Sequence, residues 1–173
     1  PDKVTSLFPK VIPTGIKFGT VTLLFDNDEK GEVTTYRADE HYTDGRHPDN
    51  VRFTNRVEDD LSRRDFTINA MAYDPIAQKL IDLHGGQKDL AVKMIRTVGD
   101  PIERFREDGL RPVRACRFAA QLNFKIGEET LAAIPQCLDI LAKVAPERIR
   151  DELIKLMRAE KPSIGLDCMH QAG

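Results

Sequence analysis

The sequence predicts an α+β domain followed by an all-α unit, and two observations lead to this class. Up to about residue 98, short apolar runs alternate with turn-forming residues, as in strands and hairpins. Beyond that point, apolar residues recur with a helical period to the end of the chain. We therefore divide the 173 residues into a first domain at 1–98 and a helical domain at 99–173.

The clearest elements of the first domain are short strands. VTLLF (21–25) and the alternating EVTTYR (32–37) flank the turn-forming stretch DNDEKG, so the pair predicts a hairpin. Further strands are predicted at VRF (51–53), KLIDL (79–83) and MIRTV (94–98).

Two other segments of the first domain are irregular. Residues 38–50 form a polar loop of unusual length, and loops of that length tend to be functional or mobile. Residues 57–73 have apolar side chains at helical spacing, but the spacing is broken around Arg64-Asp65. A turn is expected at Gly85-Gly86.

The second domain is predicted to be helical throughout. Apolar residues on a period of about 3.6 predict a helix over 101–122. Asp100-Pro101 is a suitable start, because Asp caps helices and Pro fits the first turn. Pro112 conflicts with a helix interior, so it should either kink this helix or open a new one. Further helices are expected near 128–135, 136–143, 147–159 and 163–171, with Pro146 in a first turn.

Composition excludes several classes of protein. No apolar run approaches the roughly 20 residues that span a bilayer, and the first residues lack a secretory leader, so we expect no membrane partner. The spacing of Cys116, Cys137 and Cys168 fits neither zinc nor a disulfide framework, which favours reduced thiols in the cytoplasm. The net charge of −2 argues weakly against a nucleic-acid partner. Both ends look like cuts in a longer chain.

The first candidate cluster is Arg64, Asp65 and Asn69. It places a guanidinium, a carboxylate and an amide within about one helical turn. A guanidinium suits phosphate oxygens, and an amide can bind a sugar hydroxyl or a phosphate. The alternative is a surface ion pair with a capping aspartate.

The second cluster is rich in arginine. From Arg96 to Arg117 there are six arginines, no lysine and four acidic residues. Asp108 and Arg111 are three residues apart, so on a helix they would share a face. A carboxylate beside a guanidinium could accept the amine donors of cytosine and adenine and reject guanine and uracil. The alternative is a salt-bridged helix face.

The third candidate is Glu32, at the start of EVTTYR. A carboxylate on a half-buried strand could be a ligand for Mg²⁺. The alternative is an ordinary edge-strand charge.

Together these segments resemble the class II tRNA nucleotidyltransferases, the bacterial CCA-adding enzymes and their poly(A) polymerase relatives. The resemblance covers nearly the whole chain in the order of the family. It rests on RRDFTINAMA and RFREDGLR, supported by IPTGIKFGTVTL, EVTTYR, DGRHPDNVRF and ERIRDELIKLM.

The resemblance implies a partial polymerase-β-like nucleotidyltransferase head, with an antiparallel or mixed sheet and helices, followed by a truncated all-α neck. Its RRD segment would contact the incoming nucleotide, and its EDxxR motif would read the base. Glu32 would be the strand carboxylate that joins two metal-binding aspartates, and the ERIRDEL helix would support the base-reading helix. The nucleotide-binding residues are then Arg64, Asp65, Asn69, Glu107, Asp108, Arg111, Arg114 and Arg117.

The implied reaction is template-independent addition of C and A to the 3′ end of tRNA from CTP and ATP, with release of pyrophosphate and two Mg²⁺ ions. The family's Gly-Gly-x-Val-Arg-Asp turn and its Asp-x-Asp metal pair lie upstream of the matching stretch. Glu32 alone cannot hold two metals. We therefore expect these 173 residues by themselves to be inactive.

Three alternatives stay open. The full length of the loop at 38–50 favours CCA or A addition over addition of C alone, and poly(A) polymerase is the runner-up. The chain as supplied could also be a non-catalytic nucleotide- or RNA-binding fragment. A third alternative, a purely structural domain, would not explain the arginine-rich cluster at 96–117 or the RRD segment. The sequence leaves the oligomeric state open.

Overall fold

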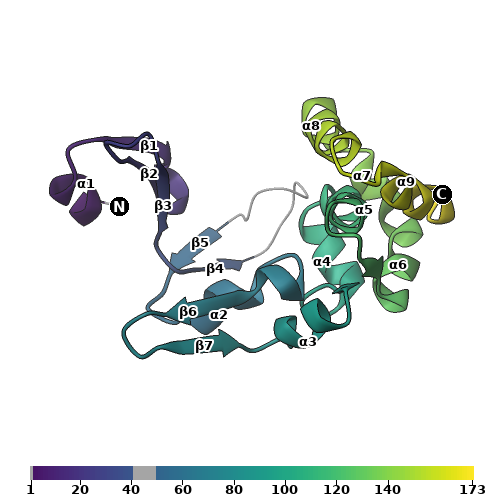
Figure 1. Ribbon diagram of the computed structural model, residues 1–173, viewed down its shortest axis with the longest axis horizontal. Helices are drawn as coiled ribbons and strands as arrows, with labels where there is room; N and C mark the ends of the chain where they lie inside the picture. Colours follow the sequence, from purple (N-terminus) through teal and green to yellow (C-terminus); the bar gives the residue numbers. More distant parts are fainter. Residues whose placement is uncertain (1, 41–49) are drawn as a thin grey trace.

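The structure is a computed structural model that describes residues 2–40 and 50–173. Figure 1 shows a small sheet with the N-terminal helix at one end and a bundle of helices at the other, with two hairpins and short helices between them. This arrangement confirms the predicted α+β class.

The N-terminal sheet has three antiparallel strands in the order β1-β2-β3. The predicted hairpin is confirmed, because β2 pairs with β3 from Thr20↔Thr34 to Leu24↔Lys30. The third strand, β1, was not predicted, since it contains Pro13 and does not alternate. The elements here are α1 (Asp2–Leu7), β1 (Val11–Gly15), a 3₁₀ turn at Ile16–Phe18, β2 (Thr20–Leu24) and β3 (Lys30–Thr34).

Two further antiparallel pairs follow, β4 with β5 and β6 with β7. The strands predicted at 51–53 and 79–83 are confirmed. The polar loop predicted at 38–50 is wrong at its start, where the backbone pairs as a strand, and residues 41–49 lie outside the described residues. The strands are β4 (Arg37–Glu40), β5 (Asn50–Phe53), β6 (Met71–Asp74) and β7 (Lys79–Asp82).

The predicted break near Arg64-Asp65 is confirmed. Helix α2 (Val57–Ser62) ends before these residues, and a 3₁₀ turn at Thr67–Asn69 leads into β6. Helix α3 (Gly86–Ala91) follows β7 and begins where only a turn was expected. Its start is capped because the Asp82 carboxylate accepts the amides of Gly86 at 2.7 Å and Gln87 at 2.9 Å.

The helix predicted over 101–122 is two helices, α4 (Pro101–Glu107) and α5 (Arg111–Leu122). The Asp100 side chain caps α4 by accepting the amide of Glu103 at 2.9 Å, as predicted. The chain leaves the helix at Asp108, where φ is −144° and ψ is 108°. Pro112 then lies in the first turn of α5, where its missing N–H costs no hydrogen bond.

Helix α5 is the centre of the helical part. A Cβ on Gly165 would lie 2.6 Å from the carbonyl oxygen of Cys116, so α9 crosses α5 closely. The helices predicted near 128–135, 147–159 and 163–171 are confirmed with slightly different bounds, whereas the one predicted near 136–143 is a 3₁₀ turn followed by a four-residue α-helix. These elements are α6 (Glu128–Ala133), a 3₁₀ turn at Pro135–Cys137, α7 (Leu138–Leu141), α8 (Pro146–Met157) and α9 (Pro162–Gln171). Strand β8 (Met94–Ile95) pairs in parallel with β9 (Lys125–Ile126).

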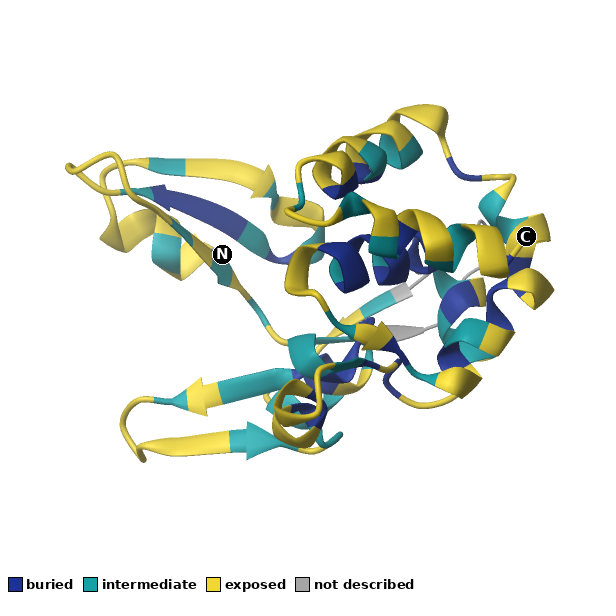
Figure 2. Ribbon diagram, turned by 45° about the vertical axis from the view of Figure 1, so that its right-hand side comes forward, coloured by how far each residue is buried: buried dark blue, intermediate teal, exposed yellow. Residues whose placement is uncertain are grey.

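The main hydrophobic core lies where the helices meet the last part of the first domain. It includes the fully buried Phe66, Ile95, Phe105 and Leu156. Figure 2 shows buried segments gathered among the helices and along β2, while much of the remaining sheet surface is exposed. Within the described ranges, no helix is long and apolar enough to cross a membrane.

Candidate nucleotide-binding site

The end of α2 carries two arginines that share one buried carboxylate. Asp60 is 3% exposed. Its Oδ1 accepts hydrogen bonds from Nε and Nη2 of Arg63 at 3.1 and 2.6 Å. Its Oδ2 accepts from Nε and Nη2 of Arg64 at 3.2 and 2.6 Å. Burial raises the pKa of Asp60, but its bonds to the two arginines outweigh that effect and hold the pKa below its usual value.

Asp65 and Asn69 lie together, as the sequence predicts. Asp65 is 9% exposed, and its Oδ1 accepts from the amide of Phe66 at 2.8 Å and from Nδ2 of Asn69 at 3.0 Å. Its Oδ2 accepts from Nε and Nη2 of Arg114, on α5, at 3.0 and 2.7 Å. Burial raises the pKa of Asp65, and the Arg114 charge and these hydrogen bonds lower it further than burial raises it. This carboxylate therefore joins the RRD segment to the helical part.

Arg111 is the second link between the two parts. Its Nη1 donates to Glu107 Oε2 at 2.6 Å and to the carbonyl of Arg104 at 2.8 Å. Its Nη2 donates to the carbonyl of Arg63 at 3.3 Å. Arg104 also pairs with Glu107 at 2.9 Å. Glu107 thus holds Arg111 at the turn between α4 and α5.

Asp108 does not pair with Arg111, and the expectation that the two share a helix face is wrong. The chain is extended at Asp108, because α4 ends there and Arg111 starts a new helix. The Asp108 carboxylate accepts from the amide of Leu110 at 3.1 Å and from Nη2 of Arg148, on α8, at 2.9 Å. Asp108 and Arg111 still flank one tight turn, since the Arg111 amide donates to the Asp108 carbonyl at 3.0 Å.

Arg117 lies in the interface between α5 and α8. Its Nε donates to Glu152 at 2.5 Å, and its Nη1 donates to Gln121 Oε1 at 2.6 Å. The guanidinium stacks on the Phe118 ring at 3.6 Å from the centroid. Burial raises the pKa of Glu152, but hydrogen bonds from Lys155 and Arg117 and the arginine charges hold it below its usual value. The sequence placed Arg117 in the nucleotide pocket, whereas in the structure its charge is neutralised inside the helical part.

Glu32 is not brought to this network. It is exposed on β3, opposite Thr22 of β2, in the sheet at the far end of the molecule (Figure 1). In the part of the chain that the structure describes, no group of three or more His, Cys, Asp or Glu side chains could hold a metal ion. These residues therefore do not by themselves fit a magnesium site.

Three charged residues of the site were not predicted from the sequence, namely Asp60, Arg148 and Glu152. Asp60 had a local signal, because it precedes Arg63 and Arg64 by three and four residues, the spacing of helical ion pairs. Arg148 and Glu152 belong to the ERIRDEL helix, which the resemblance already gave a supporting role. Their bonds to Asp108 and Arg117 are the contacts through which α8 supports the turn and α5.

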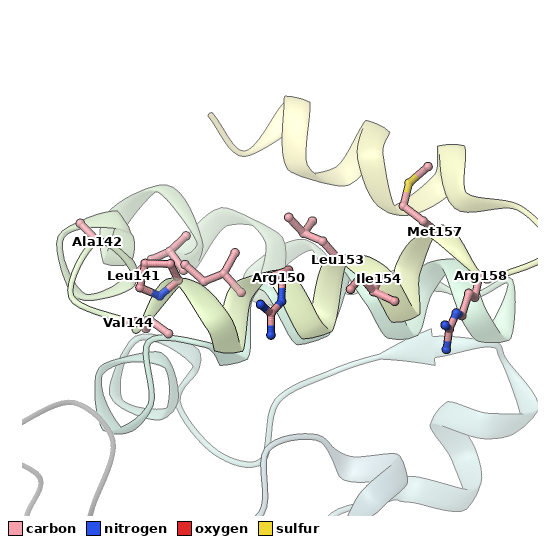
Figure 3. A pocket seen from close by; sticks show the side chains of 10 residues that line it. Leu141, Ala142, Val144, Arg150, Leu153, Ile154, Met157 and Arg158 are labelled. Atoms are coloured by element: carbon pink, nitrogen blue, oxygen red, sulfur yellow. The ribbon is translucent and has the colours of Figure 1, made fainter.

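A separate apolar groove of about 740 Å³ runs along α8 and the end of α7. Figure 3 shows Leu153, Ile154 and Met157 along it, with Arg150 and Arg158 among the lining residues. Its lining includes none of the nucleotide-binding residues that the sequence predicts.

Comparison with known protein families shows to which family the chain belongs. A model described as the poly A polymerase head domain matches residues 1–96, more than half of the chain. The chain belongs to the poly A polymerase head-domain family. A second model, described as a probable RNA- and SrmB-binding site of polymerase A, matches residues 123–173.

Curated relatives of this poly A polymerase head-domain chain are CCA-adding enzymes. The enzyme of Levilactobacillus brevis is 49% identical over 166 residues, which is 96% of this chain and 41% of that enzyme. The enzyme of Oceanobacillus iheyensis is 50% identical over 163 residues, or 94% of this chain and 40% of that enzyme. The chain therefore spans about two fifths of the length of the curated relatives it matches.

Solved structures that are similar to this chain are CCA-adding enzymes as well. The Bacillus stearothermophilus CCA-adding enzyme in complex with CTP has a TM-score of 0.86 and 38% identity, covering 98% of this chain and 40% of that one. The Thermotoga maritima CCA-adding enzyme complexed with tRNA has a TM-score of 0.78 and 28% identity, covering 99% of this chain and 38% of that one.

Proposed function

We propose that this chain is the nucleotide-selecting part of a tRNA nucleotidyltransferase. The complete protein would add C and A to the 3′ end of tRNA from CTP and ATP and release pyrophosphate. The family membership and the names of the relatives support this activity. So do the complexes of similar enzymes with CTP, ATP and tRNA.

The observation that carries the proposal is the hydrogen-bonded junction between the RRD segment and the turn between α4 and α5. Asp65 binds Arg114, and the Arg63 carbonyl binds Arg111. Side chains suited to phosphate, sugar and base thereby come from two separate stretches and are held in one rigid arrangement. Such preorganisation lowers the conformational entropy that these side chains must lose when a nucleotide binds.

Within this site, Asp108 and Arg111 read the base. The Asp108 carboxylate makes its two bonds with Arg148 and Leu110, so further lone pairs remain for an amine of cytosine or adenine. Glu107 fixes the Arg111 guanidinium as the donor to the ring nitrogen. Guanine and uracil present a carbonyl where the amine would be, so the carboxylate would repel them.

Arg64 binds the triphosphate, the Asn69 amide binds the sugar or a phosphate, and the Asp65 carboxylate holds Asn69 and Arg114 in place beside them. The Arg64 side chain is 42% exposed, so it can reach a ligand. Arg114, which is 30% exposed, would line the same pocket. Arg117 would support the site indirectly, by holding α5 against α8 through its bond to Glu152.

The two parts would be a head at 1–98 and a neck at 99–173, joined by this site. The resemblance implies Mg²⁺ held by Glu32 with the family's Asp-x-Asp pair, and among the described residues no group of three or more His, Cys, Asp or Glu side chains could hold a metal ion. We therefore expect the 173 residues alone to bind nucleotide without transferring it. The free thiols of Cys116, Cys137 and Cys168 support a cytoplasmic location.

Poly(A) polymerase is the second candidate, favoured by the description of the family model that matches residues 1–96. A polymerisation assay on the complete protein separates the two. Incubation with CTP, ATP and tRNA that lacks its 3′ end should stop after CCA. Long A tails on arbitrary RNA would instead support a poly(A) polymerase. Incorporation by residues 1–173 alone would contradict the expected inactivity of this chain.

A further inference from the structure

Asp60 fixes the orientation of Arg64 from a buried position. Both Nε and Nη2 of Arg64 bind one oxygen of Asp60, at 3.2 and 2.6 Å. The two side chains differ sharply in exposure, with 42% for Arg64 and 4% for Asp60. A charge-assisted bond to a buried carboxylate restricts the direction of a guanidinium as well as its distance.

This restriction matters for a residue that meets a phosphate. A free arginine side chain carries about 2 kcal/mol of rotamer entropy, part of which is lost on binding. The two hydrogen bonds from the Arg64 guanidinium to Asp60 restrict the Arg64 side chain before a ligand binds. These bonds use the Nε–H and one N–H of Nη2. Within the described residues, the N–H groups of Nη1 and the second N–H of Nη2 therefore remain for a ligand.

The second oxygen of Asp60 connects Arg64 to the rest of the site. Oδ1 binds Arg63 and accepts the backbone amide of Arg37, on β4, at 3.3 Å. The carbonyl of Arg63 in turn accepts Nη2 of Arg111 at 3.3 Å. Asp60 thus joins the end of α2 to β4 and, through Arg63, to α5.

We propose that Asp60 is a positioning residue for nucleotide binding, which holds Arg64 toward the triphosphate while anchoring the chain that meets Arg111. Asp60 is 3% exposed, so it acts through Arg64 and does not touch the nucleotide. The inference rests on the proposed function, in which Arg64 binds the triphosphate.

The test uses the complete protein with Asp60→Asn, and Asp59→Asn as a matched control. Asp59 is the preceding residue on α2, and its carboxylate binds Thr54 at 2.9 Å, away from Arg64. Asp60→Asn should raise KM for CTP and for ATP alike by about tenfold, with kcat within about twofold of wild type. Asp59→Asn should match wild type. Equal falls in kcat for both variants, with unchanged KM, would overturn the proposal.

A double variant separates positioning from general damage to the fold. If Asp60 acts through Arg64, Asp60→Asn combined with Arg64→Ala should have the KM of Arg64→Ala alone. A KM raised by the product of the two single effects would contradict the proposal. If Asp60→Asn does not fold, Arg64→Lys provides the test, because lysine keeps the positive charge but lacks the planar guanidinium that bonds Asp60 through two nitrogens. It should resemble Arg64→Ala, and behaviour like wild type would overturn the idea.

Binding of inorganic tripolyphosphate, measured by calorimetry, distinguishes this inference from the proposed function. Weaker binding to Asp60→Asn by about tenfold supports the positioning role even if the wild-type protein transfers no nucleotide. In that case the proposed function fails and the inference stands. Equal binding to Asp60→Asn and wild type overturns the inference even in an active enzyme.

Discussion

Replacing Glu152 with Gln is the most severe test of the ion pair between Glu152 and Arg117, because both side chains are buried. The side chains of Arg117 and Glu152 are 7% and 4% exposed and lie 2.5 Å apart. Glutamine has nearly the same shape but no charge. The Arg117 guanidinium would then lie inside the helical part without its counter-ion, which is the costly case for a buried pair.

Breaking a buried pair by removal of one partner costs about 3–5 kcal/mol. We expect Glu152→Gln to fall near the lower end, at about 3 kcal/mol, because the amide oxygen can still accept one hydrogen bond. Asp151→Asn on the same helix is the matched control. Its pair with Arg150 is 58% and 65% exposed, so its loss should cost less than about 1 kcal/mol.

The assay is urea unfolding of the 173-residue chain, followed by far-ultraviolet circular dichroism. We expect a lower urea midpoint for Glu152→Gln at an unchanged slope, and little change for Asp151→Asn. If both variants stay within about 1 kcal/mol of wild type, the buried pair of Arg117 and Glu152 does not stabilise the fold.

Three further variants or conditions extend this test. Gly86→Ala should cost about 1–3 kcal/mol in urea unfolding, because its Cβ would lie 2.4 Å from the carbonyl oxygen of Thr67; an unchanged midpoint would refute this. Phe105→Ala should cost about 3–5 kcal/mol in the same assay, since Phe105 is fully buried, and a loss below about 1 kcal/mol would contradict its place in the core. Burial raises the pKa of Asp65 and of Glu152, but hydrogen bonds and neighbouring positive charges outweigh burial and lower both pKa values, so these carboxylates stabilise the fold above their unfolded pKa values of about 4. A pH series should therefore show the free energy of unfolding falling as the pH drops below about 4, less steeply in Glu152→Gln; equal slopes would contradict the assignment.

Local patterns predicted most of the secondary structure. Alternation and turn residues gave the hairpin of β2 and β3, and the Asp100-Pro101 cap gave the start of α4. The pattern missed β1, because Pro13 and the lack of alternation hide a strand that its neighbour stabilises. The apolar period ran across α4 and α5 although Asp108 is extended, but the conflict at Pro112 predicted a kink or a new helix, and the new helix is confirmed.

Local spacing predicted that Asp65 and Asn69 lie together, but it did not predict the longer-range connections of the candidate site. The residue types of Arg64, Asp65 and Asn69 indicated the chemistry, and the structure places the last two within 3.0 Å. The partners of Asp108 and Arg117 lie 40 and 35 residues away on α8. Such pairings depend on how the helices pack, which no local spacing contains. The net charge has a similar limit, because it averages a local arginine cluster over the whole chain.

The base preference of an Asp108→Ala variant of the complete protein tests the central claim most directly. The measurement is incorporation of each of the four nucleotides into tRNA that lacks its 3′ end. We predict that the preference for CTP and ATP over GTP and UTP falls by about tenfold or more, with a smaller change in KM for the triphosphates. An equal loss for all four nucleotides would contradict the assignment of Asp108 as a base-reading residue.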